Sequence, residues 1–123
     1  MLALIRIILI PLIIVFISIG ASIFSILRPF HRNNVYHAAR YLGKVSRLFG
    51  LTIEVRIPES VKNIGPVVYV ANHQSNFDLF TMGAAVQPNT VSVGKKSLKW
   101  IPFFGFMYWV TGNILIDRDN KSK

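Results

Sequence analysis

Residues 67–78 read VVYVANHQSNFD and pass from a continuous apolar run into a cluster of polar side chains. A short apolar run of this kind is typical of a strand that is buried on both faces of a sheet. Residues 77–86 can then form a helix. The stretch therefore predicts a strand, a polar turn and a helix in succession, which is typical of an α/β domain.

The alternation of strands and helices extends to both sides of this stretch. Residues 51–57, LTIEVRI, alternate apolar and polar side chains and predict a strand with one wet face. Two more strands are predicted at residues 90–93 and 113–117, with an apolar helix at 102–110 between them. Alternating strands and helices form βαβ units around a mainly parallel sheet, so we expect an α/β fold for residues 51–123.

Residues 1–50 have a helical character instead. Between Arg6 and Arg28 lie twenty-one residues without a charge, and a hydrocarbon core needs about 20 to be crossed. A membrane helix, which spans the bilayer or lies in one leaflet, is the favoured interpretation. A signal peptide is an alternative, although the apolar run resumes after Ala21. A buried core helix is another, although the Ile residues occur on all sides.

A second, amphipathic helix is predicted over residues 35–48, where apolar residues recur at helical spacing. We expect it to begin at Asn33 or Asn34 and to stop at Gly50. Its basic side chains are Arg40, Lys44 and Arg47. The two helices would pack as a hairpin, with the basic face among lipid headgroups. The chain is thus predicted to divide into a membrane-associated hairpin and an α/β part, at residues 1–50 and 51–123.

Composition and charge agree with contact between part of the chain and lipid. Of the 123 residues, 52% are hydrophobic and 15% are charged, whereas about 25% charged residues are usual in soluble domains. The formal charge is +9, and the first acidic residue is Glu54, so residues 1–50 suit an anionic membrane surface. No nucleic-acid motif is visible, and nucleic acid is not an expected partner.

No metal site is expected. The sequence has no cysteine, which excludes disulfides and zinc sites built on cysteine. His31 and His37 lie far before the polar cluster at residues 72–78, and no second cluster of ligands is visible.

The polar cluster pairs His73 with Asp78. Five residues at about 100° each would place them roughly 140° apart on a helix, so they cannot share a helix face. If a strand ends near His73 and a helix begins near Ser75, the two side chains can converge at the sheet edge, where α/β folds bind ligands. Asn72 and Gln74 flank the imidazole. A His that a carboxylate orients is the usual general base for a hydroxyl. Asp78 also has a purely structural interpretation, because S-x-x-D is a helix-capping pattern.

The segment NHQSNFD, with its spacing H-x-x-x-x-D, resembles the first motif of the glycerolipid acyltransferases. Within that group the chain is similar to the 1-acylglycerol-3-phosphate acyltransferases, and to the bacterial members in particular. Two further stretches support the resemblance, in the family's order and at its separation: VSVGKKSLKWIPFFG at 91–105 and GNILIDR at 112–118.

The resemblance implies transfer of a fatty acyl group from acyl-CoA or acyl carrier protein to the 2-hydroxyl of 1-acylglycerol 3-phosphate. The product would be phosphatidic acid, a precursor in phospholipid synthesis. His73 would act as the base, and Asp78 would orient it. The acyl donor is a substrate, so no cofactor is implied. No covalent acyl-enzyme is needed, so Ser75 is expected to be a cap.

The resemblance also implies a phosphate site near the second motif. Arg118 would bind the substrate's phosphate, because a planar guanidinium can donate two hydrogen bonds. Its alternative is an exposed charge at a strand end. Lys95 and Lys96 are further candidates for phosphate binding, although a Lys in a loop is usually only solvated. Asp117 is expected to position Arg118 or the turn, and Gly112 belongs to the same motif as a structural residue.

Lipid substrates imply a membrane location. The basic residues after the apolar segment favour a catalytic part that faces the cytoplasm at the bacterial inner membrane. An aromatic-rich segment would lie at the interface or in the core of the fold: Trp100, Phe103, Phe104, Phe106, Tyr108 and Trp109.

The resemblance covers only the first part of the family's pattern. Family members continue into a third motif, F-P-E-G-T-R, and a fourth motif that contains Pro, and neither is present in this sequence. The chain is therefore expected to be a truncated α/β acyltransferase domain. Two alternatives are a catalytically silent membrane-associated protein and another glycerolipid acyltransferase that shares the His-x4-Asp motif.

Overall fold

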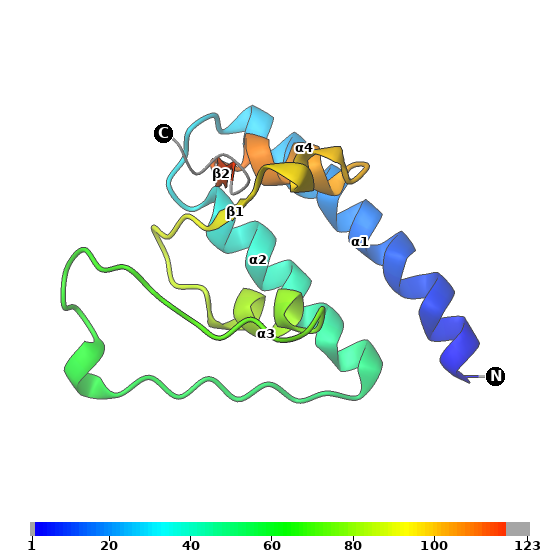
Figure 1. Ribbon diagram of the computed structural model, residues 1–123, viewed down its shortest axis with the longest axis horizontal. Coiled ribbons are helices and arrows are strands. Elements are labelled where there is room, and N and C mark those ends of the chain that lie inside the picture. The colour runs from blue at the N-terminus through cyan, green and yellow to red at the C-terminus, as the bar shows by residue number, and fades with distance from the viewer. Residues whose placement is uncertain (1, 118–123) are drawn as a thin grey trace.

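The computed structural model describes residues 2–117. Its helices are α1 (Leu2–Leu27), α2 (Asn34–Lys44), α3 (Asp78–Ala85) and α4 (Phe104–Val110). Its strands are β1 (Val93–Lys95) and β2 (Ile114–Ile116), and its short 3-10 helices are η1 (Val45–Phe49), η2 (Glu59–Val61) and η3 (Lys96–Trp100). Helices α1 and α2 pack as the predicted hairpin, with α3 against α2 and α4 against α1 (Figure 1).

Helix α1 confirms the predicted apolar helix and runs without a break through Pro11. Residues Leu4–Leu27 are long and apolar enough to cross a membrane. Only 17% of the apolar window is buried inside the structure. Most side chains of this helix are thus exposed among the described residues, which favours the membrane helix over the buried core helix.

The two faces of α1 differ in chemistry. Small polar side chains lie on the packed face: Ser18 and Ser25 are 0% and 2% exposed. The hydroxyl of Ser18 donates to the carbonyl oxygen of Ile14 at 2.7 Å, so this buried polar group is satisfied within the helix. Large apolar side chains face outward, and Phe16 is 72% exposed. The packed face of this helix thus combines small polar residues with apolar ones such as Ile10, whereas its outer face is apolar, as in helices that contact lipid.

The second predicted helix is present as α2 followed by η1. It ends at Gly50, whose φ of 75° is in the left-handed region that favours glycine. Asn33 is the residue before α2, but its side chain makes no capping hydrogen bond. The Asn33 side-chain oxygen instead accepts the N–H of Asn89 at 2.8 Å. The predicted cap is therefore wrong in its chemistry, because a distant loop supplies the partner.

Two clusters of buried residues form the core between the hairpin and the later helices. Their members are Ile10, Val45 and Phe80 in the first cluster, and Ala38, Leu42 and Met107 in the second. Ile14 and Ile17 of α1 pack against both clusters. Helices from both ends of the chain thus share one packed body, while the division at residue 50 stays a prediction.

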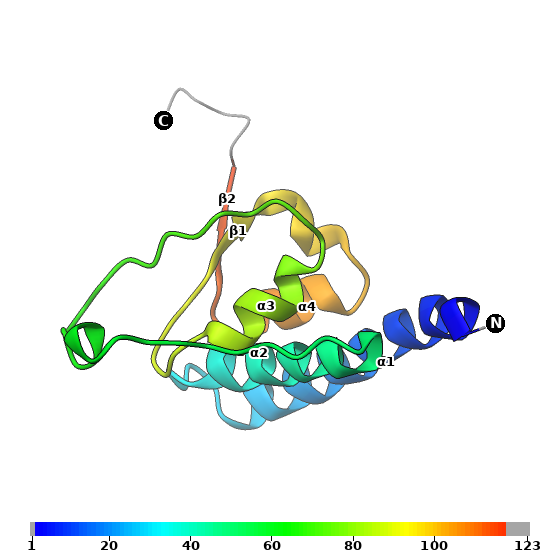
Figure 2. The same ribbon diagram turned by 90° about the horizontal axis from the view of Figure 1, so that it is seen from below.

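The two strands confirm the predicted βαβ unit. Strands β1 and β2 pair in parallel, with Val93 opposite Ile114 and Lys95 opposite Ile116. Their connection passes through η3 and α4, as a parallel crossover requires (Figure 2). The ends of the two strands differ by up to three residues from the predicted ends, and both strands are short.

The strands predicted at 51–57 and 67–71 are not formed. Both segments lack a strand assignment and belong to the long arc that joins η1 to α3 (Figures 1 and 2). Val68 and Val70 are 90% and 91% exposed rather than buried. A strand needs a neighbour to pair its backbone N–H and C=O groups, and none of the described residues pairs with these segments. The described part of the fold is thus a helical hairpin with a small parallel α/β unit.

Candidate active site

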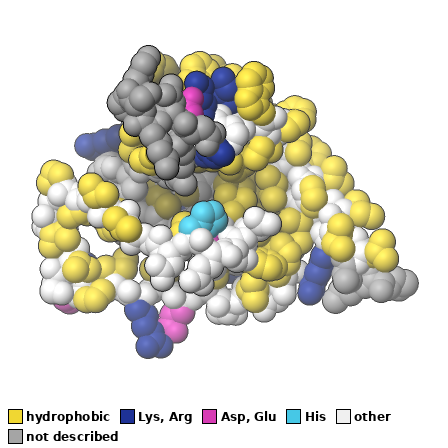
Figure 3. Space-filling model, viewed as in Figure 1, with side chains coloured by type: hydrophobic (Ala, Val, Ile, Leu, Met, Phe, Trp, Pro, Cys, Tyr) yellow, Lys and Arg dark blue, Asp and Glu magenta, His cyan; other side chains and the backbone are white. Residues whose placement is uncertain are grey.

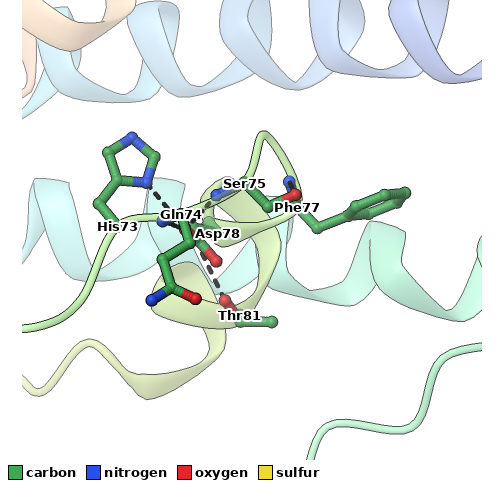
Figure 4. A network of polar contacts seen from close by, with 6 residues as sticks. All are labelled: His73, Gln74, Ser75, Phe77, Asp78 and Thr81. Carbon is green, nitrogen blue, oxygen red and sulfur yellow. Dashed lines mark hydrogen bonds and ion pairs between the residues drawn. The ribbon is translucent and has the colours of Figure 1, made fainter.

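The first turn of α3 carries the site, and its cap explains the local shape. The N–H of Asp78 donates to the carbonyl oxygen of Ser75 at 3.0 Å. The Ser75 hydroxyl accepts the N–H of Phe77 at 3.2 Å. In return, Oδ2 of Asp78 accepts the N–H of Ser75 at 2.9 Å and that of Gln74 at 2.7 Å (Figure 4). The predicted capping pattern is therefore present.

The same carboxylate oxygen also holds the imidazole. Nδ1 of His73 lies 2.8 Å from Oδ2 of Asp78, so the structure brings the two side chains together as predicted (Figure 4). The helix cap and the orientation of His73 are thus two effects of one group. The two interpretations of Asp78 do not exclude each other.

Three donors on one oxygen stabilise the charged form of Asp78. The hydrogen bond from His73, followed by those from the backbone of Ser75 and Gln74, lowers the pKa of Asp78 from 3.8 to about 2. The carboxyl group is therefore ionised at neutral pH and can only accept hydrogen bonds. In the neutral form of the imidazole, the proton must then be on Nδ1, which donates to the carboxylate.

This tautomer leaves the lone pair of Nε2 available. Nε2 lies on the far side of the ring from Asp78 (Figure 4). The side chain of His73 is 72% exposed, whereas that of Asp78 is 20% exposed. A partly sheltered carboxylate thus holds an accessible ring that can accept a proton at Nε2, which is the arrangement of a general base.

Lys95 and Asp117 lie at the carboxyl end of the two-stranded sheet, and Gly112 lies at its other end. Lys95 ends β1 and is exposed. Lys96 donates from Nζ to Oδ2 of Asp117 at 3.3 Å. Gly112 adopts a φ of 100° in the turn before β2, a conformation that glycine reaches without strain. Arg118 lies outside the described residues.

The contacts that hold α3 in place could not be predicted from the sequence. Arg40, expected at the headgroups, donates from Nη1 to the carbonyl oxygen of Ala84 at 2.5 Å. A positive charge at the C-terminal end of a helix stabilises that helix. Gly43 and Gly83 let α2 and α3 cross closely. A Cβ on Gly83 would lie 2.6 Å from the carbonyl oxygen of Ala39. The basic pattern of α2 gave no signal for this partner.

Comparison with known proteins places this sequence in a family. Residues 52–123 match the family model described as Acyltransferase, which covers His73 and Asp78. The chain belongs to the acyltransferase family.

Bacterial relatives named 1-acyl-sn-glycerol-3-phosphate acyltransferase are similar to this chain over most or all of its length. The protein from Haemophilus influenzae is 50% identical over the whole chain and 51% of its own length. The protein from Escherichia coli is 43% identical over the whole chain and 50% of its own length. The protein from Salmonella typhimurium is 46% identical over 89% of the chain and 44% of its own length.

The chain therefore spans about half the length of the curated relatives it matches. No solved structure matches it significantly.

Proposed function

We propose that this acyltransferase chain carries the His-Asp pair of a 1-acylglycerol-3-phosphate acyltransferase. The donor is the thioester of acyl-CoA or acyl carrier protein, the acceptor is the 2-hydroxyl of 1-acylglycerol 3-phosphate, and no cofactor takes part. The observation that carries the proposal is the 2.8 Å contact between His73 and Asp78, which leaves Nε2 accessible. The names of relatives 43% to 50% identical support this choice of substrates.

In the reaction, His73 takes up one proton and later gives one proton back. Asp78 holds Nδ1–H, and Nε2 of His73 takes the proton from the acceptor hydroxyl. The hydroxyl oxygen forms a bond to the thioester carbonyl carbon, and the carbon–sulfur bond then breaks. His73 returns its proton to the departing thiolate, so no charge is left on the enzyme. Ser75 keeps its capping role, since its hydroxyl accepts the N–H of Phe77.

The acceptor's phosphate is assigned to Arg118, with Lys95 and Lys96 as further contacts. The support is the parallel pairing of β1 and β2, since Lys95 and Ile116 are partners at the same end of the sheet. Arg118→Lys keeps the charge but loses the two-pronged donor. We expect this variant to raise KM for the acceptor more than KM for the acyl donor. Equal changes in the two KM values would contradict the assignment.

Lipid substrates agree with the membrane association that α1 indicates. We place the protein at the bacterial inner membrane with its catalytic part toward the cytoplasm. The support is the series of basic residues after α1, namely Arg28, Arg32, Arg40, Lys44 and Arg47. Protease added outside intact spheroplasts should therefore leave the chain beyond residue 50 uncut.

The packing of α1 supports a helix that lies in one leaflet rather than across the bilayer. Ile14 and Ile17, in the middle of α1, pack against α2 and its neighbours. Helix α2 carries exposed Arg40 and Lys44. A spanning α1 would draw these charges into hydrocarbon, at a cost of about 2.5–3.5 kcal/mol each.

Acyl transfer from labelled oleoyl-CoA to 1-acylglycerol 3-phosphate tests the proposed function in the complete polypeptide. Loss of a general base typically lowers a rate by about 10²–10⁴-fold, and we expect His73→Ala to fall in this range. His37→Gln is the matched control, because it removes the same ring from a site on α2. Equal rates for the wild type and His73→Ala would rule out the assigned base.

A further inference from the structure

An aromatic surface on η3 and α4 has no part in the acyl transfer proposed above. We define it by five side chains within residues 100–109. Their exposed fractions are 76% for Trp100, 46% for Ile101, 53% for Phe103, 50% for Phe106 and 63% for Trp109. Large apolar side chains that gather on a surface mark a contact with another molecule or with a membrane.

Helix α4 separates its side chains into two faces. Gly105 and Met107 are buried on the inner face. Phe103, Phe106 and Trp109 recur every three residues on the outer face, and the rings of Phe106 and Trp109 lie 6.0 Å apart. No charged or hydrogen-bonding side chain of α4 other than the indole N–H of Trp109 reaches outward. The outer face of α4 is thus almost entirely apolar, and its exposure to water is unfavourable.

The charged side chains within residues 79–116 are all lysines, and one of them, Lys96, is paired with Asp117 at 3.3 Å. Nζ of Lys99 lies 4.5 Å from the ring centroid of Trp100, and Lys95 and Lys96 come just before. The sequence contains no Asp or Glu between Asp78 and Asp117. Trp rings prefer the headgroup level of a bilayer, and lysines there attract anionic lipids. Protein interfaces, in contrast, are depleted in Lys.

The aromatic surface also lies beside the apolar helix. Helix α4 packs along α1, and hydrophobic side chains gather on the side of the molecule where these two helices run (Figure 3). Helix α4 is therefore a direct neighbour of the helix that we propose to enter the bilayer.

We propose that the aromatic surface is a second membrane contact, which enters the headgroup boundary of an anionic phospholipid bilayer beside α1. The inference rests on the membrane association proposed above and adds a contact from the α/β part. Two contacts fix the orientation of that part, and with it His73, relative to the lipid surface. With α1 as the only anchor, the packed body could still turn about the axis of that helix.

The two Trp residues of the chain both belong to the aromatic surface, so their fluorescence tests the proposal. Emission is measured for the complete polypeptide and for the W100F/W109F variant, which keeps the aromatic bulk. The difference between the two spectra belongs to Trp100 and Trp109. Vesicles of equal parts phosphatidylglycerol and phosphatidylcholine, brominated near the headgroups, should shift this difference emission to shorter wavelength and remove most of its intensity.

Sedimentation with the same vesicles reports the α1 anchor separately. Co-sedimentation without quenching would overturn the second contact and leave the α1 anchor in place. Failure to co-sediment would overturn both. The difference emission could instead lie at short wavelength without vesicles and stay unchanged when they are added. This result would show that protein covers the aromatic surface, and it would also overturn the proposal.

The choice of an anionic bilayer has its own test. Lys99→Gln removes one charge beside Trp100, and a charge near the surface contributes about 1 kcal/mol. We expect about fivefold more anionic lipid to be needed for half of the quenching. The same lipid requirement in the variant and the wild type would overturn the role given to Lys99.

Discussion

Oδ2 of Asp78 lies 2.8 Å from Nδ1 of His73 and accepts two backbone N–H groups as well, those of Gln74 and Ser75. One oxygen therefore starts helix α3 and orients the imidazole. The orientation of the ring depends on the fold of the turn, because the carboxylate is itself held by the backbone.

Asp78→Asn should lower acyl transfer while the protein stays folded. An amide can donate to Nδ1, which favours the wrong tautomer and removes the negative charge beside the imidazolium that forms. We expect the rate to fall by about 10³-fold, measured with labelled oleoyl-CoA in the complete polypeptide. Glu59→Gln is the matched control, since it neutralises an exposed carboxylate paired with Lys62. A rate for Asp78→Asn within a few-fold of the control would contradict the orienting role.

The contribution of Asp78 to stability should depend on pH. Its pKa is lowered in the folded protein from 3.8 to about 2, so the folded state favours the ionised form. This contribution is fully present above pH 3.8 and is lost as the pH falls through about 2. The Tm difference between the wild type and Asp78→Asn should shrink over this window. A difference that stays constant would show that the charge of Asp78 does not stabilise the turn.

Gly83→Ala should destabilise the crossing of α2 and α3. The added Cβ would lie 2.6 Å from the carbonyl oxygen of Ala39, and backbone cannot yield as a flexible side chain can. We expect a loss of about 1–3 kcal/mol in the free energy of unfolding. Gly20→Ala is the matched control, because a Cβ there meets nothing within 4 Å. Equal thermal unfolding of the two variants would mean that the helices move apart at no cost.

Phe16→Asp should weaken membrane binding through α1. Phe16 is 72% exposed on the outward face, so a charge there would enter the lipid without disturbing the core. A cost of about 3 kcal/mol corresponds to a loss of about 150-fold in partitioning, measured by sedimentation with phosphatidylglycerol vesicles. Phe16→Leu keeps the apolar character and should bind as the wild type does. Unchanged binding by Phe16→Asp would place this face outside the lipid.

Local patterns were enough for much of this fold. Helix α1 follows from a run without charges, and α2 with η1 follows from apolar residues at helical spacing that stop at Gly50. The βαβ unit from β1 to β2 follows from the alternation of apolar segments. The contact between His73 and Asp78 follows from five-residue spacing across a turn. Each of these features depends on neighbours within a few residues of the chain.

The sequence by itself therefore determined the helices, the βαβ unit and the turn that joins His73 to Asp78. Only the tertiary structure decided the long-range partners. Residues 51–57 and 67–71 have strand patterns, yet no described segment pairs with them, and a strand exists only when another backbone satisfies its hydrogen bonds. The packed side of α1 and the hydrogen bond from Arg40 to Ala84 could not be predicted from the sequence either. Both depend on groups that are distant in the chain, and the periodicity of a segment does not indicate which distant group will contact it.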